Sequence, residues 1–309
     1  MTRHHQFFTR EDLAKLGFTR DYVRERDKFG WGGPQPKEEW HPSGQIITSP
    51  IDLWEVEEAR DDVGRDTMGE PVPVHMFLWS VLPPTKPYLT KLGGVPWRPA
   101  DRAWPRDPLG KPYTFVAQFC FADSRHLVSS KLPGDVLLVF FEGWYSGSGK
   151  GVVLEWSKLA IDEPVEAADV PPQELPVPNY SGVIYATDEY PNGKERAYEA
   201  LGNRGSVHLV ADTQSTKIGR STFFIQNDPR QPGEELLCTL SSVYPADSHW
   251  KAKRATARWP LLDLERYDTP AAPPSINGWS TETMEFADAG AQYFLIDGEG
   301  QVRVAGDCY

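Results

Sequence analysis

Short runs rich in Val, Phe, Tyr and Leu follow one another between residues 70 and 160, and Pro, Gly and Asp bound them. The runs read VPVHMFLWSV (72–81), YTFVAQFCFA (113–122), GDVLLVFFEG (134–143) and GVVLEWS (151–157). Short apolar runs between turn-forming residues are typical of β-strands. This part of the chain is therefore expected to be β-rich.

A second β-rich stretch follows a surface connection that has five prolines, residues 161–180. The later half repeats three patterns of the first in the same order. KLGGVPW (91–97) is echoed by KIGRSTF (217–223), TFVAQFCFADS (114–124) by CTLSSVYPADS (238–248), and VLLVFFEG (136–143) by AQYFLIDG (291–298). These echoes favour a duplication of one β-rich unit, and chance similarity among short hydrophobic strands is the alternative.

The N-terminal part differs from both halves. Residues 9–28 are typical of two short helices, with Thr9 and Asp12 forming a cap at the first. We therefore predict an α+β, β-rich fold with two related sheet-containing halves, a possible internal duplication and a short helical N-terminal arm. The expected boundaries are 1–80 for the arm and irregular lead-in, 81–162 for the first half, 163–180 for the Pro-rich connection, and 181–309 for the second α+β half.

Charge and composition restrict the class of partner. The net charge is −12, whereas binding to nucleic-acid backbones depends on clustered Lys and Arg, so nucleic acid is an unlikely partner. The longest apolar stretch, about eight residues, is too short to cross a membrane, and no export signal is visible at the start. Three cysteines without a CxxC pair indicate reduced thiols. We expect a cytoplasmic protein whose acidic surface could steer it towards a basic partner.

The loop GWYSGSGKG (143–151) has the glycine, serine and lysine content of a phosphate-binding loop. Such a loop needs Gly, four residues and then Gly-Lys-Ser/Thr, with a helix behind it. Trp144 stands where the first glycine should be, Gly151 follows Lys150, and the residues VVLEWS come next. The stretch therefore predicts a β-hairpin with a flexible tip and no nucleotide site.

Other catalytic patterns are also lacking. The seven histidines form no metal-binding pair, and no serine stands in a GxSxG elbow. We therefore expect no metal and no cofactor, and the sequence leans towards a protein without enzymatic activity. Trp97 and Trp104 lie in a proline-rich stretch that could present them to a sugar or a protein partner. The alternative is that they seal the edges of the sheet.

Several stretches resemble the YwqG-like proteins, a bacterial family of unknown function. They are KLGGVPWRP…WPRDPLGKPYTFVAQFCFAD…LPGDVLLVFF in the first half, KIGRSTFFIQNDPR (217–230) and EFADAGAQYFLI (285–296). The resemblance covers residues from about 85 to 309 and implies an α+β fold with extensive sheet. This chain has Gly219-Arg220-Ser221 where the family tends to have Gly-Gly followed by proline, and Phe286-Ala287 in place of Trp-Gly. The resemblance also implies an immunity or accessory role beside bacterial toxins.

Five polar residues are candidates for a binding site. Gln226, Asp228 and Arg230 alternate along one expected strand as it runs out into a turn. Gln118 is a polar residue inside an apolar strand, and Asp288 precedes the last resembling strand. These residues could line one polar cleft. Structurally, Asp228 could instead stabilise a turn while Arg230 pairs with a neighbour.

Three hypotheses of function follow. The first is a non-catalytic binding protein that occludes a basic protein such as a toxin. The alternative is a small-ligand-binding protein or an enzyme with a polar cleft around Gln226, Asp228 and Arg230. A third and weaker hypothesis is DNA binding through residues 9–28.

Overall fold

The computed structural model describes residues 3–15, 46–47, 50–80, 83–143, 151–201, 208–243, 284–287 and 290–308. Its elements are β1 Phe7–Phe8, α1 Arg10–Lys15, β2 Ile46–Ile47, α3 Pro50–Val63, η2 Arg65–Thr67, β3 Val72–Ser80, β4 Lys91–Leu92, β5 Thr114–Cys120, η3 Arg125–Leu127, β6 Val136–Phe141, β7 Val152–Ser157, η4 Ala167–Asp169, β8 Tyr180–Glu189, α4 Lys194–Leu201, α5 His208–Ala211, β9 Gln214–Ser215, β10 Lys217–Gly219, β11 Glu235–Ser241, β12 Ala291–Ile296 and β13 Val302–Asp307. The described chain is strand-rich, as the sequence predicts.

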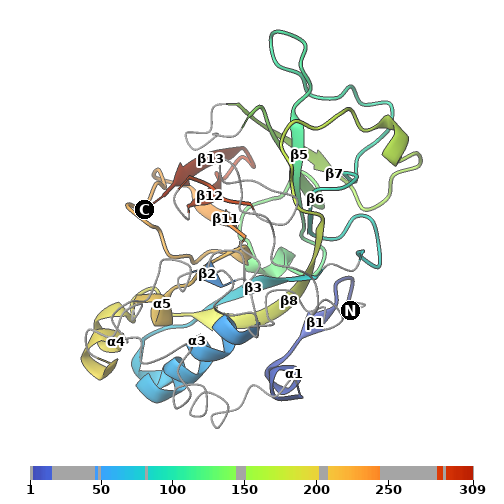
Figure 1. Cartoon of the computed structure of the whole chain (residues 1–309). Coiled ribbons are helices and arrows are strands. Elements are labelled where there is room, and N and C mark those ends of the chain that lie inside the picture. The colour runs from blue at the N-terminus through green and yellow to red at the C-terminus, as the bar shows by residue number, and fades with distance from the viewer. Residues whose placement is uncertain are drawn as a thin grey trace, which may run out of the picture.

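One large sheet organises the described residues. Its strand order is β13-β12-β11-β10-β3-β8-β4-β5-β6-β7, and every neighbouring pair along this order is antiparallel. β1 adds a short parallel pairing to β8, and β2 pairs with β9 in a separate parallel ribbon. In Figure 1 the strands β5–β7 and β11–β13 form two flanks beyond the long central pair β3 and β8. The helices α3, α4 and α5 gather beside that central pair.

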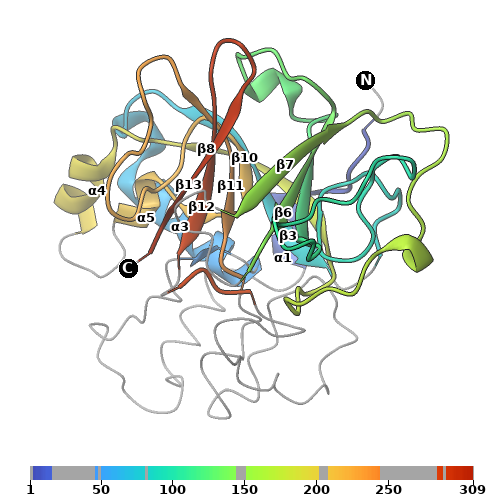
Figure 2. The ribbon, with the colours of Figure 1, turned by 90° about the horizontal axis from the view of Figure 1, so that it is seen from above.

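The sheet is nearly closed, and its inner face holds the main hydrophobic core. Side chains of both flanks meet there, with the rings of Phe119 and Phe294 at 5.7 Å and those of Phe141 and Phe286 at 5.9 Å. Figure 2 shows the two flanks from above, with β11–β13 on one side and β5–β7 on the other. Because side chains alternate along a strand, every second residue of β6 points into this core and the others point outwards.

Three different covers close the outer face. Loop residues around Trp97 and Trp104 pack on β5 and β6, whereas Phe224 and Ile225 pack on β11 and β12. Between these flanks, α3 and α4 form a small apolar cluster with Tyr190 at the end of β8. The region 50–80, which the sequence assigns to the lead-in, thus supplies a central strand and a covering helix.

The two flanks follow the same ladder scheme. β4 pairs with β5 and β8, and β10 pairs with β11 and β3. Lys91 lies opposite Gln118, and Lys217 lies opposite Thr239. Each flank also has a register shift at the equivalent position. It lies between Phe115 and Ala117 where β5 pairs with β6, and between Leu236 and Cys238 where β11 pairs with β12. The central pair therefore joins two flanks of equal strand order.

The expected hairpin is formed by β6 and β7, and its tip at 144–150 lies outside the described residues. Thr9 and Asp12 exchange hydrogen bonds at the start of α1, as the cap predicts, while the second expected helix falls on residues 16–28 outside the description. The echo between TFVAQFCFADS (114–124) and CTLSSVYPADS (238–248) aligns Gln118 with Ser242. This alignment is out of register, because Thr239 lies opposite Lys217 as Gln118 lies opposite Lys91.

Candidate functional site

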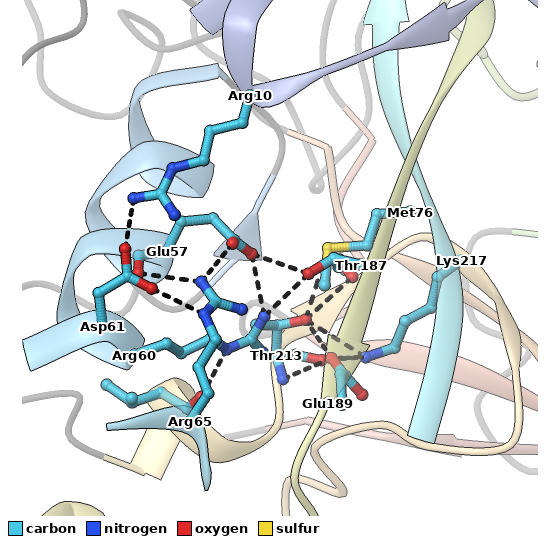
Figure 3. Close-up of polar contacts among 12 residues, drawn as sticks. Arg10, Glu57, Arg60, Asp61, Arg65, Met76, Thr187, Glu189, Thr213 and Lys217 are labelled. Atoms are coloured by element: carbon cyan, nitrogen blue, oxygen red, sulfur yellow. Dashed lines mark hydrogen bonds and ion pairs between the residues drawn. The ribbon is translucent and has the colours of Figure 1, made fainter. Parts of the chain in front are cut away.

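A buried ion pair lies at the outer face of the central strands. Lys217 of β10 and Glu189 of β8 are both fully buried, and Lys217 Nζ lies 2.5 Å from Glu189 Oε1 (Figure 3). Lys217 Nζ also donates to the Thr213 carbonyl at 2.6 Å, and the Thr213 N–H donates to the same carboxylate at 2.9 Å. Burial lowers the pKa of Lys217, and the nearby Glu189 carboxylate opposes that effect.

The helix α3 brings a second set of charges to the same face. Glu57 Oε1 accepts from Arg60 Nη1 at 3.1 Å and from the Thr187 hydroxyl of β8 at 2.8 Å. Its other oxygen, Oε2, accepts from Arg65 Nη2 at 2.6 Å. Burial alone would lower the pKa of Arg65, but Glu57 and Asp61 raise it above its usual value. These contacts fasten α3 to β8 and to the turn that follows the helix.

Two atoms of this network have no hydrogen-bond partner among the described residues. They are Arg60 Nη2 and Glu189 Oε2, a donor and an acceptor that are both buried. Arg60 uses its other nitrogens on Glu57 and on the Val210 carbonyl, which accepts from Nε at 2.8 Å. Because Arg60, Glu189 and Lys217 are fully buried, the network cannot meet a substrate at the surface. Its geometry suits it to holding the helical cover in place.

Gln118 is buried, and its side chain is hydrogen-bonded throughout. Its Oε1 accepts from the Trp97 N–H at 2.9 Å, and its Nε2 donates to the carbonyls of Pro87 and Leu89 at 2.9 and 2.7 Å. The expectation that this residue needs internal partners is confirmed. The amide therefore ties the segment before β4 and the loop after it to β5.

Trp97 and Trp104 are half-buried against the outer face of the first flank. The Trp97 indole donates to the Lys158 carbonyl at 2.9 Å, and the Trp104 indole donates to the Tyr113 carbonyl at 2.8 Å. Trp104 also packs edge-on against Phe140 with the ring centres 5.4 Å apart. Of the two readings made from the sequence, these contacts correspond to sealing of the sheet.

Gln226, Asp228 and Arg230 lie between β10 and β11. The strand expected here is wrong, because the segment is irregular and packs by Phe224 and Ile225 against β12. Gln226 Nε2 donates to the Cys308 carbonyl at 2.7 Å. Asp228 Oδ1 accepts from the Arg230 N–H at 3.0 Å, and the Arg230 guanidinium pairs with the same carboxylate. The turn and ion pair match the structural alternative.

The polar candidates are not joined in one cluster by these contacts. Gln118 is bonded to residues 87–97, whereas Gln226 is bonded to the end of the chain after β13. Asp288 lies outside the described residues.

Two histidines that the sequence left without a role meet at the turn after β5. His5 Nδ1 lies 2.9 Å from Asp123 Oδ2, and His75 Nδ1 lies 2.8 Å from Ser124 Oγ. The Asp123 carboxylate also accepts the backbone N–H groups of His4 and His5. Burial lowers the pKa of His75 to about 4, and burial is also the main reason that the pKa of His5 is lowered. The turn thus anchors the N-terminal segment.

Residues 161–179 of the surface connection between β7 and β8 carry five exposed carboxylates and no basic residue. The acids are Asp162, Glu163, Glu166, Asp169 and Glu174. Hydrogen bonds fix the backbone of this acidic connection, residues 161–179, to the first flank. Ala100 N donates to the Glu163 carbonyl and Val165 N donates to the Arg98 carbonyl, both at 2.9 Å. The buried side chains of Val165 and Leu175 anchor it further.

A family model described as Domain of unknown function (DUF1963) matches residues 90–300. The chain belongs to this family. The DUF1963 match includes β4 to β12 and the acidic connection, whereas β3, α3 and the segment that carries His5 precede it. No curated protein matches the chain.

No helix among the described residues is both long and apolar enough to span a membrane. Within the same ranges, no group of three or more His, Cys, Asp or Glu side chains is arranged to hold a metal ion.

Proposed function

We propose that this protein is a non-catalytic binding protein that occludes a basic protein partner. The observation that carries the proposal is the acidic connection, in which five exposed carboxylates stand on a backbone fixed to the sheet. A charged surface of one sign speeds encounter with a partner of the opposite sign. A fixed backbone also loses less conformational freedom on binding than a flexible one does.

Because the backbone of the acidic connection is already fixed, little conformational entropy is lost when its carboxylates bind a partner. Phe115 N donates to Gln173 Oε1 at 2.8 Å, which adds a third hydrogen-bonded attachment between η4 and β8. Glu174 pairs with Lys111 at 2.5 Å, so its charge is partly matched within the chain. The remaining acids, Asp162, Glu163, Glu166 and Asp169, supply the negative surface for the partner.

Within the family, we assign the chain to the YwqG-like bacterial branch and infer that it acts in the cytoplasm as an immunity or accessory protein whose partner is a toxin. The supporting features are the motif stretches in the printed sequence and the acidic surface. Occlusion needs a complementary surface and no catalytic group. The internal contacts of Gln118, Gln226, Asp228 and Arg230 favour this function over the polar-cleft alternative.

We further infer that the two flanks descend from a duplicated unit. The supporting observations are the equal strand order on both sides of β3 and β8 and the matching register shifts. In that arrangement the first strands of the two halves are swapped. β3 of the first half pairs with β10 of the second half, and β8 of the second half pairs with β4 of the first half.

The experiment is a pull-down of the tagged protein from its host's lysate at low and high salt. We expect one stoichiometric basic protein whose recovery falls at high salt, because exposed charges are screened there. A variant with Asp162→Asn, Glu163→Gln, Glu166→Gln and Asp169→Asn should lose that protein while remaining folded.

The matched control removes four exposed carboxylates elsewhere, through Asp66→Asn, Glu70→Gln, Glu195→Gln and Glu299→Gln. It changes the net charge equally and should keep the partner. Equal loss of the partner protein from both variants would show that binding depends on net charge alone and not on the acidic connection. Recovery of no specific protein from the wild type at either salt would contradict occlusion.

A further inference from the structure

β4 and β10 occupy the same place in the two flanks, and each begins with a buried lysine. Lys91 is 5% exposed and Lys217 is fully buried. Each lies opposite a buried polar residue of the next strand, Gln118 for Lys91 and Thr239 for Lys217. Directly opposite residues of an antiparallel pair share a face of the sheet. The side chains of Lys91 and Lys217 therefore leave the sheet at equivalent positions on its outer face.

The two lysines differ in their counter-charges. Lys217 has Glu189 at 2.5 Å and the Thr213 carbonyl at 2.6 Å. The Lys91 ammonium donates to the Val95 carbonyl at 2.5 Å, and among the described residues it forms no ion pair with a carboxylate. A buried cation is costly unless it is paired and hydrogen-bonded. An ammonium has three donors, so Lys91 retains donor capacity for an anion.

The Lys91 ammonium also lies nearer to the surface than the Lys217 ammonium. Its bond to Val95 is only partly buried, whereas the Lys217–Glu189 bond is fully buried. The loop that carries Val95 contains Gly94, which is exposed and approaches the exposed side chain of Asn179. Burial lowers the pKa of Lys91 to about 8, and no nearby carboxylate counteracts this effect. A ligand that supplied one would restore the usual charge balance.

We propose that Lys91 is the anchor of a carboxylate-binding site beneath the Gly93–Val95 loop. The carboxylate of a small ligand takes the place beside Lys91 that Glu189 takes beside Lys217. The bond formed is a charge-assisted hydrogen bond from Nζ, and no covalent step is involved. This site lies on the first flank and does not depend on the proposed protein partner.

The test uses the full chain with lysines labelled with ¹³C at Cε, observed by NMR. Acetate is added at constant ionic strength, with chloride as the matched salt. We expect acetate to raise the pKa of Lys91 by up to about one unit, a tenfold change in protonation equilibrium, and to leave Lys217 unchanged. Lys91→Met identifies the signal. No difference between acetate and chloride at Lys91, or an equal change at Lys217, would overturn the proposal.

A second arm distinguishes a small ligand from an acidic protein segment. A short oligoglutamate peptide carries the same carboxylates on a longer chain. Response to acetate, with or without response to the peptide, supports the small-ligand site. Response to the peptide alone would show that the carboxylate comes from a protein and would overturn the small-ligand assignment.

Thermal unfolding gives an independent check of the two lysines. Lys91→Met should unfold at the same or a higher temperature than the wild type, because it removes a buried cation without orphaning a carboxylate. It should also lose any rise in Tm produced by acetate. Lys217→Met should lower Tm because it leaves Glu189 unpaired. An equal fall in Tm for both variants would show that Lys91 is internally matched and would overturn the proposal.

Discussion

The strands β3 and β8 hold two N-terminal elements, and the two attachments use different polar groups. On the outer face α3 is held by charged side chains, through Glu57 and its arginines. The segment 3–8 pairs with the edge of β8 through β1, and towards the inner face its contacts are made by imidazoles, with the His5 ring beside Phe77 and the Phe7 ring edge-on to His75. His75 and Met76 are adjacent in β3, so their side chains lie on opposite faces.

The difference shows how each kind of polar side chain can be buried. His5 Nε2 accepts the backbone N–H of Thr90, so Nδ1 carries the proton shared with Asp123 and the ring is neutral. A neutral ring is buried at lower cost than an ion. The charges beneath α3 instead pair with one another and with β8. The attachment at His5 and His75 should therefore weaken in mild acid, and the attachment beneath α3 should weaken when a single member of an ion pair is removed.

The largest expected effect is on the ionic side. Glu189→Gln leaves Lys217 buried without its hydrogen-bonded carboxylate, and removal of one partner of a buried pair costs about 3–5 kcal/mol. The urea midpoint should fall accordingly. Glu199→Gln, on the exposed face of α4, is the control and should change stability little. If both variants had the wild-type midpoint, the pair would have no role in stability.

The next effect is on the imidazole side. Asp123→Asn weakens the carboxylate contacts to His5 and to the backbone of residues 4 and 5, at a cost of about 2 kcal/mol. Hydrogen exchange should then rise at Phe7, Phe8 and Ile184, where the N-terminal segment meets β8. Faster exchange in α3 but not in this segment would contradict the assignment of Asp123 as its anchor.

Acid should separate the two attachments. The pKa of His75 is lowered from 6.5 to about 4, and that of His5 is also lowered, so the unfolded chain binds protons first. The stabilisation from neutral His75 is complete above pH 6.5 and is lost as the pH falls towards 4, and that from His5 is lost in the same direction. Urea midpoints measured across this range should decline in the wild type and decline less in His75→Asn. Identical slopes would assign the loss to other groups.

The smallest effect is expected at the rim of the ionic side. Arg10 pairs with Glu58 and Asp61, but its side chain is 42% exposed. Arg10→Ala should therefore cost about 0.5 kcal/mol and should be measurable only at low salt. Melting curves at two ionic strengths would check this. A loss as large as that of Glu189→Gln would mean that the rim and the buried pair act as one network.

Much of the local structure could be predicted from residue patterns. The short apolar run of β6 and the glycine-rich turn after it predict the hairpin with β7, and the buried amide of Gln118 finds the internal partners it needs. The wrong expectation for Gln226 to Arg230 has a local cause. Alternating polar residues predict a strand, but Asp228 bonds the backbone of Arg230 and closes a turn.

The sequence by itself determined which apolar stretches become strands, which polar groups need partners and where the acidic connection lies, because these depend on near neighbours and on burial. Only the tertiary structure decided that β3 joins β8 at the centre and that Glu57, Glu189 and Lys217 share one outer face. Those contacts join residues far apart along the chain. Alternation gives a side chain's face relative to its neighbours in the same strand, but the pairing partner depends on the packing of the whole sheet.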